Sequence, residues 1–286
     1  MLSYRHAFHA GNHADVLKHF VLMQVLQHAT QKDKPLWYID THAGAGMYAM
    51  DKGYATQNAE HETGIARLWN LTDMPIALAD YVALLKKLNP DDRLKRYPGS
   101  PAFAQTLLRH NDRLRLFELH PNDCKLLRQS FKGAGYSPSS HKVIIETADG
   151  FAGLKAILPP PPRRAVVLID PPYEEKQDYR RVLDALKDSL QRFATGTYIL
   201  WYPLLQRPEP RQLHEKLQKL GLPSWLQVTL SVQSPLPEGF GMHGSGLFIV
   251  NPPWTLPETL EGVMPYLVKV LGQDAGAGFS VEHKIP

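Results

Sequence analysis

A carboxylate, two prolines and a tyrosine stand together at the end of an apolar run, in the order Asp170-Pro171-Pro172-Tyr173. The prolines end the predicted strand, because neither can donate a ladder hydrogen bond. Asp170 can accept one N–H of a planar exocyclic amine and the Pro171 carbonyl the other. These bonds localise the nitrogen lone pair toward an electrophile, in a geometry that the prolines hold rigid. Tyr173 offers a ring for stacking, so the motif predicts a site for a nucleobase amine.

Further groups that could bind a ligand follow the other predicted strands. Gly44 and Gly46 form a turn after the first strand, Glu118 ends the second, and Asp149 follows the third. Ligands of an open α/β sheet bind outside the carboxyl ends of its strands. Backbone at a glycine turn lies close to a ligand, Glu118 can accept both ribose hydroxyls, and Asp149 can accept from an adenine amino group. With Asp170 nearby, this order predicts methyl transfer from S-adenosylmethionine to a base amine.

Each of these groups also has an ordinary structural interpretation. The glycine turn lacks the third glycine of a dinucleotide fingerprint, Glu118 could lie on the surface, and Asp149 could cap the next helix. Glu118 also stands much further along the chain than the usual distance of about 20 residues, which a helical insert would explain. Glu60 and Glu62 are nearer, but they lie at a predicted helix start, so Glu118 is preferred.

A second motif of the same type, Asn251-Pro-Pro-Trp254, follows the last predicted strand. No glycine turn and ribose carboxylate precede it in matching order. We therefore expect Asn251 to form a turn or a strand end, and Asp170 to be the catalytic aspartate.

The N-terminal segment is rich in histidine, with His6, His9, His13 and His19. No cysteine accompanies them and their spacing mixes loop with helix, so we expect hydrogen-bonding and stacking roles and no metal. The segment also offers aromatic and basic groups suited to RNA, namely Tyr4, Arg5, His6, Phe8, His9 and Lys18. The alternative is that it only closes the edge of the sheet.

The elements that must position these groups are strands alternating with helices. Strands are predicted at 35–40, 114–119, 142–147, 165–170, 197–202, 225–232 and 246–251. This alternation indicates an α/β fold with a mainly parallel sheet covered on both faces. The last two strands lack a helix between them, so we expect them to be antiparallel and to close one edge. Asn12 is expected to cap a helix that runs to about Gln31, and no strand is predicted from Met47 to about Leu108.

Length and composition are compatible with one domain over residues 1–286, with an N-terminal motif at 1–31 and a helical insert at about 48–97. The net charge of +4 makes a nucleic-acid partner plausible without indicating one. Cys124 is the only cysteine, which excludes a disulfide framework and a thiolate-rich metal site. No signal peptide and no run of roughly 20 apolar residues is present, so we expect a cytoplasmic protein without membrane association.

The sequence resembles the RlmJ family, bacterial 23S ribosomal RNA adenine-N6 methyltransferases, along nearly its whole length. The motifs that carry the resemblance are LSYRHAFHAGNHADVLKH, DTHAGAG, YPGSP, ELHP, ADGF and LIDPPYE, together with GIAR, RFATG, LWYP and NPPW. The N-terminal block is specific to the family, whereas Asp-Pro-Pro-Tyr occurs in many amino-methyltransferases.

The resemblance implies a Rossmann-like S-adenosylmethionine-dependent methyltransferase fold with a small helical insert, acting as a monomer. It implies cofactor contacts at His19, His42, Ser100, Glu118, Asp149 and Gly150. We predict that Asp170, Pro171 and Tyr173 are catalytic, and that Tyr4, His6 and Lys18 bind the substrate. The implied partner is 23S rRNA before full ribosome assembly. Its target base is expected to be extruded from its stack or unpaired.

Other functions remain open at this level. A DNA adenine-N6 methyltransferase would share the core, a nicotinamide-dependent oxidoreductase would share the sheet, and a non-catalytic RNA-binding module would share the basic N-terminal block. A set of cations near the insert could hold phosphates or form a solvated helix face: Lys86, Lys87, Arg93, Lys95 and Arg96.

Overall fold

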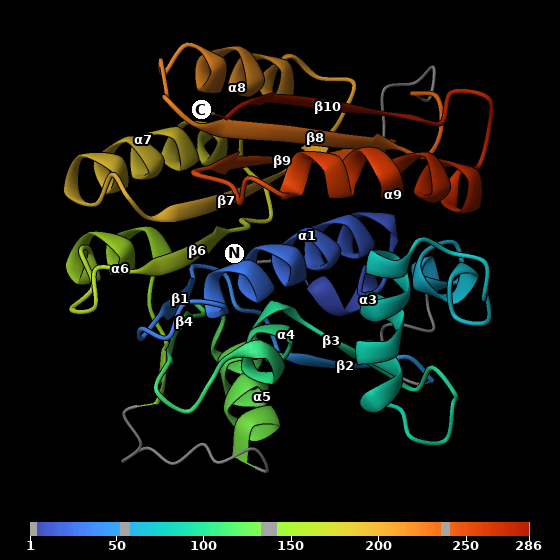
Figure 1. The fold of residues 1–286 in the computed structure, drawn as a ribbon, viewed down its shortest axis with the longest axis horizontal. Coiled ribbons are helices and arrows are strands. Elements are labelled where there is room, and N and C mark those ends of the chain that lie inside the picture. Colours follow the sequence, from blue (N-terminus) through green and yellow to red (C-terminus); the bar gives the residue numbers. More distant parts are fainter. Residues whose placement is uncertain (1–4, 52–57, 133–141, 236–240, 286) are drawn as a thin grey trace.

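An eight-stranded mixed sheet separates two layers of helices in the computed structural model, which describes residues 5–51, 58–132, 142–235 and 241–285 (Figure 1). The order is β10-β8-β9-β7-β6-β1-β4-β5. The bounds are β1 (Trp37–Asp40), β4 (Arg113–Phe117), β5 (Val143–Glu146), β6 (Ala165–Ile169), β7 (Thr197–Leu204), β8 (Trp225–Ser231), β9 (Gly244–Val250) and β10 (Gly278–Lys284). Strands β7, β6, β1, β4 and β5 are parallel, so the predicted α/β, Rossmann-like class is confirmed.

The strand order also locates the binding crevice. From β1 the chain continues to β4 and β5 on one side, and returns to β6 on the other. The crevice of such a sheet opens where the order reverses, at the carboxyl ends of β1 and β6.

The helices cover the two faces unequally. One face carries α1 (His13–Thr30), α3 (Ile76–Lys87), α4 (Ser100–Leu107), α5 (Pro121–Lys132) and α9 (Leu256–Leu271). The other carries α6 (Gly150–Ile157), α7 (Lys176–Arg192) and α8 (Pro208–Gln218). Successive strand residues point to opposite faces, so Tyr38 packs in the first core and Ile39 in the second. No helix in the described parts of the chain is long and apolar enough to span a membrane.

Helix α1 is the element that brings the N-terminal motif to the crevice. Asn12 caps it as predicted, because its Oδ1 accepts from the backbone N–H groups of Ala14 and Asp15 at 3.0 Å. The apolar side chains in the first three turns of α1 are buried, but so are Asp15, Lys18 and His19, because the sheet and neighbouring helices surround the helix. Buried charges of this kind must be paired, which predicts partners close by.

The insert differs from the prediction in one respect. Strand β2 (Met47–Ala49) pairs antiparallel with β3 (Arg96–Pro98), so the expectation of no strand from Met47 to about Leu108 was wrong. Three residues are too few to produce a visible period of two. Between them lie the 3₁₀ helices η2 (Glu60–Glu62) and η3 (Ile65–Arg67), and α3. The described residues between β2 and β3 therefore form helices and loops, and a short ribbon joins the two ends of the segment.

The far edge of the sheet also differs. Strands β8 and β9 are antiparallel as expected, but β9 lies between β7 and β8, and β10 forms the edge. The prediction that the last two strands close the edge was wrong because the segment after Gly272 contains a seven-residue strand. None of the seven residues of β10 is fully buried, so the strand lacks the apolar pattern of a buried strand.

Candidate active site

A cavity of about 690 Å³ lies at the carboxyl ends of β1, β4, β5 and β6. It brings together predicted site residues from many separate segments of the chain. Tyr4 lies outside the described residues, and all the others line the cavity: His6, Lys18, His19, His42, Ser100, Glu118, Asp149, Gly150, Asp170, Pro171 and Tyr173.

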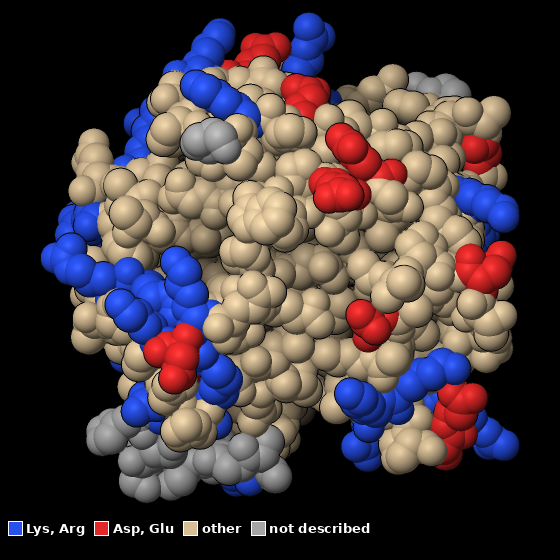
Figure 2. All heavy atoms as spheres, viewed as in Figure 1, with Lys and Arg blue, Asp and Glu red and all other residues tan. Residues whose placement is uncertain are grey.

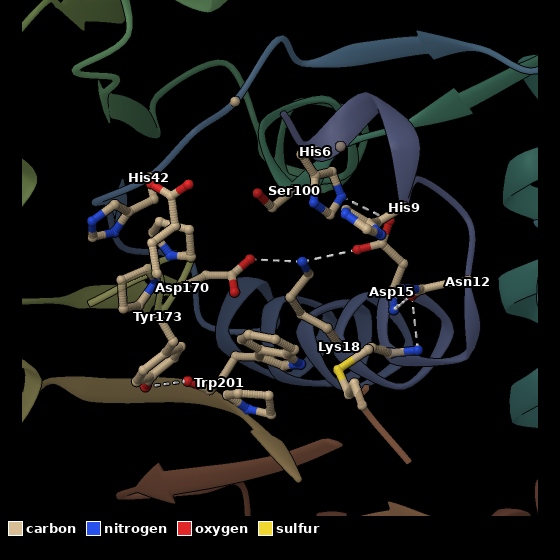
Figure 3. A pocket seen from close by; sticks show the side chains of 18 of the residues that line it. His6, His9, Asn12, Asp15, Lys18, His42, Ser100, Asp170, Tyr173 and Trp201 are labelled. Atoms are coloured by element: carbon tan, nitrogen blue, oxygen red, sulfur yellow. Dashed lines mark hydrogen bonds and ion pairs between the residues drawn. The ribbon is translucent and has the colours of Figure 1, made fainter. Parts of the chain in front are cut away.

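A chain of alternating charges crosses this cavity (Figure 3). The Nζ atom of Lys18 lies 2.6 Å from Oδ2 of Asp170 and 2.9 Å from Oδ1 of Asp15. The other oxygen of Asp15 accepts from the backbone N–H of Gly11 and lies 2.9 Å from Nε2 of His6. The sequence did not reveal the contact between Lys18 and Asp170, because these two residues belong to distant segments.

Burial and neighbouring charges act in opposite directions on the pKa values of Asp15 and Lys18. It would raise the pKa of Asp15, but His6 and Lys18 hold that pKa well below its usual range. Burial would likewise lower the pKa of Lys18, but Asp15 and Asp170 raise it above its ordinary value. Both groups are therefore charged at neutral pH, and Lys18 fixes the carboxylate of Asp170.

The turn after Asp170 is held in an uncommon conformation. Tyr173 has a φ of +53°, in the left-handed region that residues other than glycine rarely adopt. Its hydroxyl donates to the carbonyl of Trp201 at 2.7 Å, and its ring packs against Tyr179 at 4.5 Å between centroids. Only 6% of Tyr173 is exposed, so a small part of the ring faces the cavity. A full stacking role for Tyr173 stays a prediction.

The glycine turn and Glu118 form one unit. Gly44 and Gly46 have φ values of +61° and +77°, which explains why glycine stands at both positions. Oε2 of Glu118 accepts from the Gly44 N–H at 2.8 Å, and Oε1 accepts from the His120 N–H at 2.7 Å. Burial raises the pKa of Glu118, although the two N–H groups favour its charged form. Its carboxylate is thus held in one orientation beside the backbone of the glycine turn.

Asp149 combines two contacts. Its Oδ1 accepts from the backbone N–H groups of Phe151 and Ala152, so the alternative interpretation as a helix cap is correct. Its Oδ2 pairs with Arg181 of α7. The guanidinium of Arg181 also lies 4.7 Å from the centre of the Phe151 ring, whose edge meets the ring of His42 at 5.1 Å. Arg181 lines the cavity but carries no recognisable motif, so sequence reasoning missed it.

Ser100 and His42 meet at a buried aspartate that was not predicted as a site residue. Oδ2 of Asp40 accepts from the Ser100 and Tyr38 hydroxyls at 2.7 and 2.8 Å, and Oδ1 from the His42 N–H at 3.2 Å. Burial raises the pKa of Asp40 to about 6. Its place at the end of an apolar strand was the signal that could have identified it.

The N-terminal histidines each have a different environment. Nδ1 of His19 lies 2.8 Å from the Tyr97 hydroxyl, and burial lowers the pKa of His19 to about 3. His6 faces Asp15, and His9 faces Glu60 at 2.8 Å. Among the residues that the structure describes, no group of three or more His, Cys, Asp or Glu side chains could hold a metal ion.

Asn251 lies at the amino ends of the parallel strands, opposite the end at which the cavity opens. The preceding Val250 pairs with Tyr198 at the amino end of β7, because β9 is antiparallel to it. The Nδ2 group of Asn251 donates to the carbonyls of Ala194 and Gly196 at 2.8 Å. The prediction that Asn251 forms a strand end is therefore confirmed.

Comparisons with known proteins agree with this architecture. Residues 33–284 match the family model described as "Ribosomal RNA large subunit methyltransferase D, RlmJ". The chain is 43% identical over 287 residues to ribosomal RNA large subunit methyltransferase J of Haemophilus influenzae, with both chains fully covered. It is 45% identical over 267 residues to the Escherichia coli protein of that name, covering 93% of each. Protein LPL1258 of Legionella pneumophila superposes with a TM-score of 0.85 at 35% identity, covering 96% of this chain and 98% of the other. This chain therefore belongs to the RlmJ family of methyltransferases.

Proposed function

We propose that the protein transfers a methyl group from S-adenosylmethionine to N6 of one adenine in 23S rRNA. The relatives are named as methyltransferases of large-subunit ribosomal RNA, which supports the substrate class. The observation that carries the proposal is the hydrogen bonding of the Asp170 carboxylate. Within the described residues only its Oδ2 has a hydrogen-bond or ion-pair partner, Lys18, so Oδ1 remains available for an amine.

The chain's own residues account for activation of the amine. Oδ1 of Asp170 accepts one N–H of N6 and the carbonyl of Pro171 accepts the other, so the lone pair of N6 is no longer delocalised into the ring. Lys18 pairs with the other oxygen of this carboxylate and fixes its position. Oδ1 of Asp170 is also positioned to receive the proton that N6 loses when it becomes methylated. S-adenosylmethionine supplies a methyl group on a sulfonium, which needs no further activation.

The residues beyond Asp170 fit the cofactor. Glu118 would accept the ribose hydroxyls, backbone at Gly44 would pass close to the cofactor, and Asp149 would accept from the adenine amino group. A Cβ on Gly150 would lie 2.0 Å from the carbonyl oxygen of Thr41, so only glycine allows this close approach. His19, His42 and Ser100 complete the predicted set. Because Ser100 already donates to Asp40, we expect its contact with the cofactor to be a shared hydrogen bond.

We also propose that the substrate is bound by Tyr4 and by His6 and Lys18, which line the cavity. We further propose that the protein acts as a monomer on rRNA that is not fully assembled, in the cytoplasm. Phosphates could contact the Lys and Arg side chains near the end of α3, which Figure 2 shows with acidic groups among them. Lys86 pairs there with Asp92, and Lys95 with Asp91, so these contacts would have to compete with ion pairs.

Membership of a methyltransferase family excludes a nicotinamide-dependent oxidoreductase and a non-catalytic RNA-binding module. The remaining alternative is methylation of adenine in DNA. It shares the Asp170 chemistry and differs only in the polymer.

The test uses labelled S-adenosylmethionine with unmodified 23S rRNA, tRNA or DNA, and nucleoside mass spectrometry of the product. We expect N6-methyladenosine in 23S rRNA alone, and none with Asp170→Ala, while that variant binds the cofactor within a few-fold of wild-type affinity. Product in DNA alone would refute the RNA substrate. Near-normal turnover by Asp170→Ala would refute the role of this carboxylate.

A further inference from the structure

The cavity continues past Lys18 into a second compartment, here called the distal lobe. Its wall is formed by side chains that the proposed methyl transfer does not use: His9, His13, Glu60, Thr63, Gln233 and Met242. In Figure 3, His9 and Asn12 lie on the opposite side of Lys18 from His42 and Tyr173. The distal lobe is therefore part of the same cavity as Asp170 and lies across Lys18 from His42, a predicted cofactor residue.

His13 is an unusual residue in this wall. It is the first residue of α1 and is 7% exposed. Its Nδ1 atom is buried without a hydrogen-bond partner among the described residues. Burial lowers the pKa of His13 to about 4, so the ring is neutral at physiological pH. A buried polar atom without a partner costs about 1–3 kcal/mol, and the large majority of such atoms are paired. Because His13 also lines the cavity, its ring can offer a hydrogen bond to a ligand there.

Glu60 gives the distal lobe its charge. Its Oε1 lies 2.8 Å from Nδ1 of His9, and its Oε2 accepts from Nδ2 of Asn12 at 2.9 Å. Burial would raise the pKa of Glu60, but these two partners hold it below its usual value. The hydrogen bond to Glu60 raises the pKa of His9. An oriented, ionised carboxylate repels a phosphate and accepts from the ring N–H or amino group of a base.

Other residues of the cavity wall are less polar. Met242 lines the cavity, and so does Val232, which is 1% exposed. A thioether is polarizable and packs well against an aromatic ring. An apolar wall with hydrogen-bonding groups along one side suits the flat face and the polar edge of a nucleobase.

We propose that the distal lobe binds the base of a nucleotide that flanks the target adenosine in the RNA, with His13 and Glu60 contacting its edge. This inference rests on the proposed function, because a polynucleotide substrate is what delivers a second base next to the first. Single-stranded RNA is commonly read in this way, through unstacked bases that are hydrogen-bonded at their edges. The distal lobe then contributes to the choice of adenine, while Asp170 performs the chemistry.

The test combines protein variants with single abasic positions in the RNA. Full-length 23S rRNA is assembled by ligation with one abasic nucleotide at each position flanking the target in turn. Wild type, His13→Ala and Met242→Ala are compared by kcat/KM for N6-methyladenosine formation. His28→Ala, near the far end of α1, is the matched control, and cofactor calorimetry reports whether each variant is folded.

We expect wild type to lose about tenfold or more in kcat/KM at one abasic position, as for loss of a stacked or hydrogen-bonded base. His13→Ala and Met242→Ala should show a similar loss on intact RNA and no further loss on that abasic RNA, whereas His28→Ala should match wild type. If His13→Ala does not fold, Met242→Ala decides. If the loss caused by His13→Ala and Met242→Ala adds to the loss caused by the abasic nucleotide at every flanking position, the inference is wrong. An inactive wild type on intact 23S rRNA overturns the proposed function, and this inference with it.

Discussion

Nζ of Lys18 and Oδ2 of Asp170 lie 2.6 Å apart although 152 positions separate the two residues in the chain. Through this contact the N-terminal motif forms a wall of the candidate active site. The same ammonium lies 5.7 Å from the centre of the Trp201 ring, and Asp15 holds it from the other side. For the described part of the N-terminal segment, the alternative that it only closes an edge of the sheet is therefore wrong, because α1 packs over the centre of the sheet and reaches the crevice.

Replacing Lys18 tests this contact. Lys18→Met leaves Asp15 and Asp170 without their shared cation, and breaking a buried ion pair on one side costs about 3–5 kcal/mol. We expect a loss of this size in the free energy of unfolding, and at least a ~100-fold lower rate of methyl transfer. Denaturant unfolding and single-turnover assays measure the two effects. Lys187→Met, at an exposed position of α7, is the control and should change neither. Normal turnover by Lys18→Met would show that Asp170 needs no fixed cation.

The sequence predicted the positions of the strand-end residues but not their partners. Glu118, Asp149 and Asp170 could be located because parallel strands bring their carboxyl ends to one edge. The pairing of Asp149 with Arg181 depends instead on how α7 lies against α6, and nothing in the local sequence encodes that. Asp40 was visible at a strand end, but its complete burial follows from the packing of Ser100 and Tyr38 around it.

The missed strands have a related explanation. The three-residue strands β2 and β3 form because the two ends of the insert meet, and β10 forms because β8 offers it an open edge. Both pairings are imposed by tertiary contacts. Sequence periodicity reports only the burial of one segment at a time, so it detects the central strands and not these.

The ribose role of Glu118 makes a prediction about cofactor affinity. Glu118→Ala removes the predicted acceptor for two hydroxyls and leaves the Gly44 and His120 N–H groups unpaired. Hydrogen bonds to a charged group contribute about 1.5–3 kcal/mol, so we expect 10- to 100-fold weaker binding of S-adenosylmethionine by calorimetry. Glu146→Ala is the control, because Glu146 ends β5 and pairs with Arg115 instead. Unchanged affinity of Glu118→Ala would exclude Glu118 as the ribose ligand.

The buried Asp40 predicts an unusual dependence of stability on pH. Burial raises its pKa from 3.8 to about 6, so the folded state binds the proton more tightly than the unfolded state. The resulting stabilisation is complete below pH 3.8 and is lost as the pH rises through about 6. At about 1.4 kcal/mol per pKa unit, it amounts to about 3 kcal/mol.

Asp40→Asn cannot titrate and should lack this contribution. We therefore expect the difference in unfolding free energy between wild type and Asp40→Asn to shift in favour of wild type as the pH falls from 7 to 4. Urea unfolding at several pH values measures it. The other titrating groups are common to both proteins and cancel in the difference. A difference that stays constant with pH would mean that the pKa of Asp40 is not raised.

The close packing around Gly150 predicts that an alanine there destabilises the protein, whereas an alanine at Gly262 does not. A Cβ at this position would lie 2.0 Å from the carbonyl oxygen of Thr41, so Gly150→Ala must push the start of α6 away from the turn after β1. We expect the unfolding free energy to fall by about 1–3 kcal/mol, as for overpacking, and cofactor affinity to fall with it. Gly262→Ala, in the middle of α9, meets nothing within 4 Å and should raise stability by about 0.5–1 kcal/mol. Thermal unfolding and calorimetry of both variants measure these changes. Equal stability of the two variants would show that the turn at Thr41 yields easily, and that Gly150 is not required for the approach of backbone to the cofactor.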